Sequence, residues 1–126
     1  MATTVTVPLT ELLQPNTATP NAGVTPSSYA ATDTVLIPMT DKGVIVAITG
    51  ATGAGTLTVA KGTGIGASND LAISTVKDKT VFVQLDSSSY EDIEAKQADG
   101  TTNPNYGYAV ATATGNGGSI VAVSAL

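Results

Sequence analysis

The sequence contains no cysteine, histidine, tryptophan or arginine. Without cysteine there is no disulfide, thiolate zinc ligand or thiol nucleophile. Without histidine, no side chain has an ordinary pKa near 7, and Ser-His-Asp and Cys-His arrangements are excluded. Without arginine there is no bidentate clamp for phosphate or carboxylate. We therefore expect no enzymatic activity, no cofactor and no metal site, and a protein that offers a surface to other proteins.

Charge is scarce and mostly negative. Ten acidic residues face five lysines, which gives a net charge of −5 and a pI near 4.2. This balance opposes nucleic-acid binding, which depends on neutralising phosphates, and it disfavours anionic membranes. No run approaches the ~18 apolar residues of a membrane span, and the first residues lack the basic and apolar regions of a signal peptide. We expect neither nucleic acid nor a membrane as a partner.

Composition divides the chain into an N-terminal arm, residues 1–33, and a domain, residues 34–126. Residues 1–32 hold four of the six prolines and a single charged residue, Glu11. Their apolar side chains are Val5, Val7 and Leu9, which alternate as in a strand, followed by Leu12 and Leu13. The segment is interpreted either as a surface loop or as an extended arm that lies on a partner. In the second case, deleting residues 1–14 should abolish binding and leave the fold intact.

The rest of the chain reads as short strands separated by turns. Threonine and valine are abundant, and β-branched side chains suit the pleated surface of a sheet. Strands are predicted at 34–39, 44–49, 56–60, 71–76, 80–85, 107–114 and 119–124, with a helical turn within 87–94. This pattern predicts an all-β fold, a small antiparallel β-sandwich or jelly-roll-like barrel.

A glycine-rich stretch, Thr49–Gly55, follows an apolar strand and is similar to the phosphate-binding turn of nucleotide-binding α/β dehydrogenases. That turn needs a helix after it. Thr56–Ala60 has instead the alternation of a strand. The stretch therefore predicts the loop of a β-hairpin.

Four carboxylates gather near one another in the sequence: Asp86, Glu91, Asp92 and Glu94. Paired carboxylates serve glycosidases, but sugar-binding clefts usually carry aromatic platforms. The spacing is also not that of a calcium loop. We interpret the cluster as a solvated surface that caps turns, with a cation site as the alternative. Nearby tyrosines, Tyr90, Tyr106 and Tyr108, fit packing at the edge of the core or anchoring at an interface.

Several of these stretches together carry a family resemblance. Asp70–Ile73 and Thr80–Asp92 resemble the strand pair of small capsid decoration (cement) proteins of tailed bacteriophages, with its Asp-Ser-Ser corner and following aromatic residue. Gly107–Ala111 and Gly118–Leu126 are similar to the closing strands of that family, and Asp41–Val46 to its opening strand. At the corner, Ser89 stands where the family often has a basic residue.

The resemblance implies a non-enzymatic structural protein on the outer surface of the virion capsid, made in the host cytoplasm. Its partner would be the major capsid protein, which it would bind and stabilise at capsomer junctions. It would act as a homo-oligomer, with a trimer favoured. The residues expected to contact the capsid or a neighbouring subunit are Val5, Val7, Leu9, Leu12, Leu13 and Tyr90.

Two other functions stay open. A carbohydrate-binding β-sandwich on a virion surface or fibre would need exposed aromatic side chains or a calcium site. A structural subunit of another assembly, such as a tail or a bacterial surface layer, would have the same composition.

Overall fold

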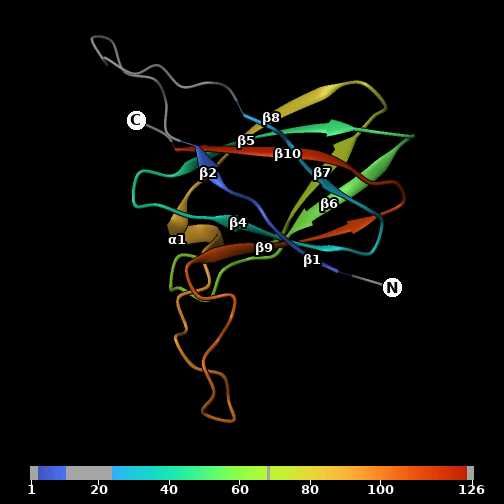
Figure 1. The fold of residues 1–126 in the computed structure, drawn as a ribbon. Helices are drawn as coiled ribbons and strands as arrows, with labels where there is room; N and C mark the ends of the chain where they lie inside the picture. Colours follow the sequence, from blue (N-terminus) through green and yellow to red (C-terminus); the bar gives the residue numbers. More distant parts are fainter. Residues whose placement is uncertain (1–2, 11–23, 68, 125–126) are drawn as a thin grey trace.

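The computed structural model describes residues 3–10, 24–67 and 69–124, which form ten strands and one short helix (Figure 1). The strands of one sheet lie in the order β1 (Thr4–Thr6), β4 (Thr34–Pro38), β9 (Tyr108–Thr114), β6 (Gly55–Val59) and β7 (Leu71–Thr75). The strands of the second sheet lie in the order β2 (Leu9–Thr10), β10 (Gly118–Ser124), β5 (Val44–Gly50) and β8 (Thr80–Leu85). The short strand β3 (Ser27–Tyr29) also pairs with β10. The two sheets pack together, which confirms the predicted all-β sandwich.

Strand direction departs from the expected antiparallel arrangement at one edge of each sheet. β1 pairs with β4 in parallel, and β2 pairs with β10 in parallel, whereas the other pairs are antiparallel. Parallel neighbours need a crossover connection rather than a hairpin. Both parallel pairs join strands that are far apart in the chain, where local sequence pattern carries no information on direction. The sheets are therefore mixed.

The core lies between the sheets and is built by alternation. In β5, the side chains of Val44, Val46 and Ile48 are fully buried, and the residues between them face outward. Burying a side chain of this size contributes roughly 1.5–3 kcal/mol to folding. β9 adds three buried alanines, Ala109, Ala111 and Ala113. These small residues belong to the same core cluster as larger side chains of the other sheet, such as Ile48 and Ile120, which fits a close-packed interior.

The described part of the predicted N-terminal arm belongs to both sheets. β1 lies beside β4, with Val5 opposite Val35. After Val7, whose N–H donates to the carbonyl of Leu36, the chain passes Pro8 and joins the other sheet as β2. β3 also belongs to the predicted arm, and its residues are not among the strands that the sequence predicts. Thr4–Thr6 and Leu9–Thr10 thus form strands of the sandwich in this structure.

A long loop between α1 (Ser87–Tyr90) and β9 projects from one end of the sandwich (Figure 1). Lys96 and Thr102 form an isolated antiparallel bridge within it, and the Gln97 N–H donates to the carbonyl of Thr101 at 2.8 Å. In the described part of the chain, no helix is long and apolar enough to cross a membrane.

Candidate functional site

The corner that carries the family resemblance is a tight, hydrogen-bonded turn. One carboxylate oxygen of Asp86 accepts hydrogen bonds from the hydroxyls of Ser88 at 2.8 Å and Ser89 at 3.1 Å. These bonds, that from Ser88 first, lower the pKa of Asp86. Tyr90 ends the helical turn and packs against the core while staying half-buried. The serines therefore hold the corner's shape, and Tyr90 attaches it to the sandwich.

The predicted carboxylate cluster does not assemble around a common point. Asp92 Oδ2 accepts from Asn103 Nδ2 at 3.0 Å, and Asp92 Oδ1 accepts from the N–H of Glu94 at 3.1 Å. Desolvation and the charge of Asp41 raise the pKa of Glu91. Within residues 3–10, 24–67 and 69–124, no three acidic side chains come together as metal ligands would. The carboxylates that form bonds serve turns and loops, as the capping interpretation expects.

The residues predicted to contact a capsid are placed differently from one another. Val7 is 2% exposed and fills the core, so its side chain is not available to a partner. Val5 is half-buried and packs against the same core. Leu9 is 37% exposed at the sheet edge, and Leu12 and Leu13 lie outside the described residues. Val7 is predicted to contact the capsid or a neighbouring subunit, and in this structure it packs in the core of its own chain instead.

The glycine-rich stretch joins β5 of one sheet to β6 of the other, so it is a connection between the two sheets and not the predicted loop of a β-hairpin. A strand follows it rather than a helix, as the sequence pattern predicts. Position 50 must be a glycine, because a Cβ atom there would lie 2.4 Å from the carbonyl oxygen of Val76. Gly50 also accepts a hydrogen bond from the Asp78 N–H at 2.9 Å. The glycine thus lets the β7–β8 turn approach β5, and it serves packing rather than phosphate binding.

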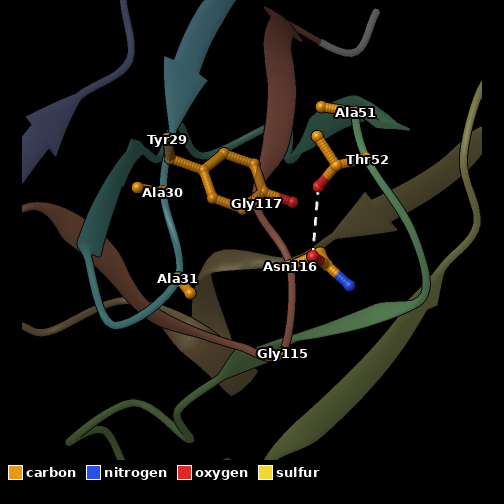
Figure 2. A pocket seen from close by; sticks show the side chains of 8 residues that line it. All are labelled: Tyr29, Ala30, Ala31, Ala51, Thr52, Gly115, Asn116 and Gly117. Atoms are coloured by element: carbon orange, nitrogen blue, oxygen red, sulfur yellow. Dashed lines mark hydrogen bonds between the residues drawn. The ribbon is translucent and has the colours of Figure 1, made fainter.

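An open pocket of about 340 Å³ lies beside this loop, between it and the β9–β10 turn (Figure 2). Thr52 Oγ1 donates to Asn116 Oδ1 at 3.1 Å, and Asn116 Nδ2 donates to the carbonyl of Ala54 at 2.8 Å. Tyr29 also lines the pocket. Its hydroxyl is buried and has no hydrogen-bond partner among the described residues, and burial raises the pKa of Tyr29. No charged residue lines the pocket. It offers neutral hydrogen-bonding groups and no acid or base for catalysis.

A larger surface lies on the outer face of the second sheet. The outward-facing side chains there, which we call the outer face, are Ile45, Ala47, Thr49, Thr80, Phe82, Gln84, Ser119, Val121 and Val123. Phe82 and Ala47 are opposite each other in the register, and Ala47 is opposite Val121. An apolar row therefore runs across three strands. Phe82, the only phenylalanine of the chain, is 73% exposed.

Charge is absent from this face because it is absent from every described strand. The lysines, aspartates and glutamates of the described residues all lie in loops and turns. The sequence pattern of β8 predicts its core-facing side chains, Val81, Val83 and Leu85, and the outer face is not among the predicted sites. The same alternation places Phe82 on the opposite side. The signal was therefore present, as an aromatic residue on the face expected to be polar.

Comparison with protein-family models, with curated proteins and with solved structures finds no match to this chain.

Proposed function

We propose that this chain is a structural, non-enzymatic decoration (cement) protein of a tailed bacteriophage head. It binds the major capsid protein on the outer surface of the virion, at capsomer junctions, and stabilises the capsid; it is made in the host cytoplasm. Support comes from the resemblance of the strand pair, the Asp86–Tyr90 corner and the closing strands, and from the all-β fold. The homotrimer that the resemblance implies stays a prediction.

The outer face is the observation that carries this proposal furthest. Contiguous exposed apolar surface on a soluble protein marks a place where another molecule binds. Here Phe82 is exposed and its neighbours Ala47 and Val121 are partly exposed, and none of the three strands that form this row carries a charge that would need to be desolvated. The charges in the loops keep the free protein soluble, and a net charge away from zero helps this. An uncharged sheet face suits docking on a capsid, whereas it offers no acid, base or nucleophile for catalysis.

Binding to heads tests the proposal directly. Expanded heads that lack the decoration protein, from the phage whose genome encodes this chain, are mixed with the purified protein, and occupancy is counted by electron microscopy. We expect saturable binding to the outer surface and heads that withstand a higher temperature. Val121→Lys places a charge in the apolar row and should reduce affinity at least about tenfold, because a desolvated unpaired charge is unfavourable at an interface.

The matched control is Thr112→Lys, which adds the same charge to an exposed position on the other sheet. This variant should bind as the wild type does. Circular dichroism and thermal unfolding show whether Val121→Lys keeps the fold. Absence of wild-type binding to these heads contradicts the proposed function, and equal occupancy by folded Val121→Lys contradicts the role of the outer face.

A carbohydrate-binding module on a virion surface or fibre is the second candidate. The pocket beside Tyr29 and Asn116 favours it, because binding pockets combine apolar walls with a few convergent polar groups. A glycan array with and without EDTA separates the two functions. A glycan signal that Asn116→Ala removes would support the carbohydrate function, and its absence leaves the decoration protein.

A further inference from the structure

The β8 strand is an open edge of the second sheet. Among the described strands it pairs with β5 alone. It has six residues, whereas the other edge strands have between two and five. Proteins usually protect sheet edges with short strands, prolines or charges. β8 has none of these protections, and it carries the exposed Phe82.

The backbone of β8 is oriented to form a second ladder. Opposed residues in an antiparallel pair alternate between hydrogen-bonded and non-hydrogen-bonded pairs. The Gly50 N–H donates to the carbonyl of Lys79, so Gly50 and Lys79 form a hydrogen-bonded pair. Along the register that follows, every second pair is therefore hydrogen-bonded, beginning with this one. Thr80, Phe82 and Gln84 are therefore in the non-hydrogen-bonded pairs. Their N–H and C=O groups point away from β5, toward the open edge.

We infer that β8 pairs antiparallel with β8 of a second copy of this chain, about a two-fold axis at Phe82. The charges that flank the strand favour this occupant. Lys77, Asp78 and Lys79 precede β8 with a net positive charge, and Asp86 follows it. Antiparallel pairing about Phe82 places Asp86 of one copy opposite Asp78 of the other, with Lys77 and Lys79 on either side of that position, so the negative end of one strand meets a segment of net positive charge. A parallel arrangement would bring like charges together.

The strand is also self-complementary in the inferred register. Phe82 stands opposite Phe82 of the second copy, and Thr80 stands opposite Gln84. These are the residues whose backbone groups face the edge, and each hydrogen-bonded pair exchanges two bonds. The two phenylalanine rings lie on the same side of the joined sheet, where cross-strand aromatic pairs stabilise pairing. Both outer faces then form one continuous surface. The inference goes beyond the proposed function, since it needs no capsid.

The mass of the protein in solution tests this pairing. Sedimentation equilibrium of the full chain without any capsid should give twice the 12.5 kDa of one chain. Phe82→Lys places two like charges opposite each other and should weaken dimerisation at least tenfold. Phe82→Glu should do the same. An equimolar mixture of the two variants should recover the dimer, because the opposed charges then attract.

Tyr106→Lys is the matched control, since Tyr106 is a similarly exposed aromatic residue in the projecting loop, 54% exposed. This variant should remain dimeric. The inference is overturned if the wild-type chain stays monomeric at every concentration in a series that spans about a 100-fold range and reaches millimolar. Failure of the Lys and Glu variants to recover the dimer when mixed also overturns it. A two-fold edge cannot build the homotrimer that the family resemblance implies, so a trimer in solution would support that expectation and overturn the inference. Circular dichroism of each variant establishes that it is folded, and head binding is measured separately, so the two proposals fail independently.

Discussion

The carboxylate of Asp33 accepts hydrogen bonds from both the backbone N–H and the hydroxyl of Thr3, each at 3.0 Å. Its other oxygen accepts from the N–H of Ala30 at 2.9 Å. Asp33 thus joins the strand at the start of the described chain to the turn between β3 and β4. The N–H of Thr34 donates to the carbonyl of Thr3 at 2.9 Å and continues this contact.

Asp33→Ala should therefore loosen β1 from the sandwich. The substitution leaves the Ala30 N–H and the Thr3 donors without their acceptor, and a lost partner for a buried donor destabilises the fold. We expect a lower melting temperature and faster amide hydrogen exchange in β1. Asp99→Ala is the control, because Asp99 bonds only within its own exposed loop, to Thr101. Equal melting temperatures for the two variants would contradict the joining role of Asp33.

The pH dependence of stability gives a second measurement on Asp33. Its hydrogen bonds, that from Ala30 first and then that from Thr3, lower the pKa of Asp33 from its ordinary 3.8. A carboxyl group with a lowered pKa in the folded state stabilises the protein above its unfolded pKa. This stabilisation is lost as pH falls through the lowered folded pKa. Between about pH 5 and pH 2 the melting temperature of the wild type should fall more than that of Asp33→Ala. Parallel curves would contradict this contribution.

Local pattern predicts much of the sandwich because most of its strands bury one face. The range 80–85 is predicted and observed with the same bounds, since Val81, Val83 and Leu85 share one face of the strand and turns flank it. The parallel edges of β1 and β2 were not predictable in this way. Their partners are distant in the chain, and Ser27–Tyr29 has too few apolar residues to mark a strand. Pairing at a sheet edge is decided by tertiary packing.

The candidate site, like the fold, is only partly predictable from the sequence. The absence of histidine, cysteine and arginine indicates a surface without catalysis, but it does not place that surface. The apolar row of Phe82, Ala47 and Val121 depends on the registers of β8, β5 and β10. A sequence shows which residues share a face of one strand, and only the fold brings three such faces together. The alternation of Val5 and Val7 shows the converse, because a pattern that fits a partner surface also fits the chain's own core.

Val7→Ala tests whether this segment is part of the folded domain. Removing two methyl groups from a side chain that is 2% exposed should lower the free energy of unfolding by roughly 2 kcal/mol, as large-to-small core changes do. Val24→Ala, at a position that is 42% exposed, should change it by less than about 0.5 kcal/mol. Chemical denaturation measures both. For the same reason, deletion of residues 1–14 should destabilise the fold as well as affect binding. A deletion variant with wild-type stability would contradict the placement of β1 and Val7.

Thr32 adopts a left-handed backbone conformation, with φ of 71°. This region is strained for a β-branched residue and free of strain for glycine. Thr32→Gly should therefore raise the melting temperature, because the relief of about 1–2 kcal/mol exceeds the backbone entropy that glycine loses. Asp78 has φ of 61°, but aspartate tolerates this region better, so Asp78→Gly should have a smaller effect. A drop in melting temperature for Thr32→Gly would mean that its side chain contributes more than the strain removes.

Tyr29→Phe tests the buried hydroxyl beside the pocket. The hydroxyl has no hydrogen-bond partner within the described structure, so its removal should leave the free energy of unfolding unchanged or raise it. Burial raises the pKa of Tyr29, so this residue stabilises the fold below its unfolded pKa of about 10, and the contribution is lost as pH rises through the higher folded pKa. Thermal unfolding between pH 8 and pH 12 should show a smaller loss of stability in Tyr29→Phe than in the wild type. A variant that is less stable at pH 8 by about 1 kcal/mol or more would show that the hydroxyl has a bonding partner in solution, and the pocket would then be the place to look for it.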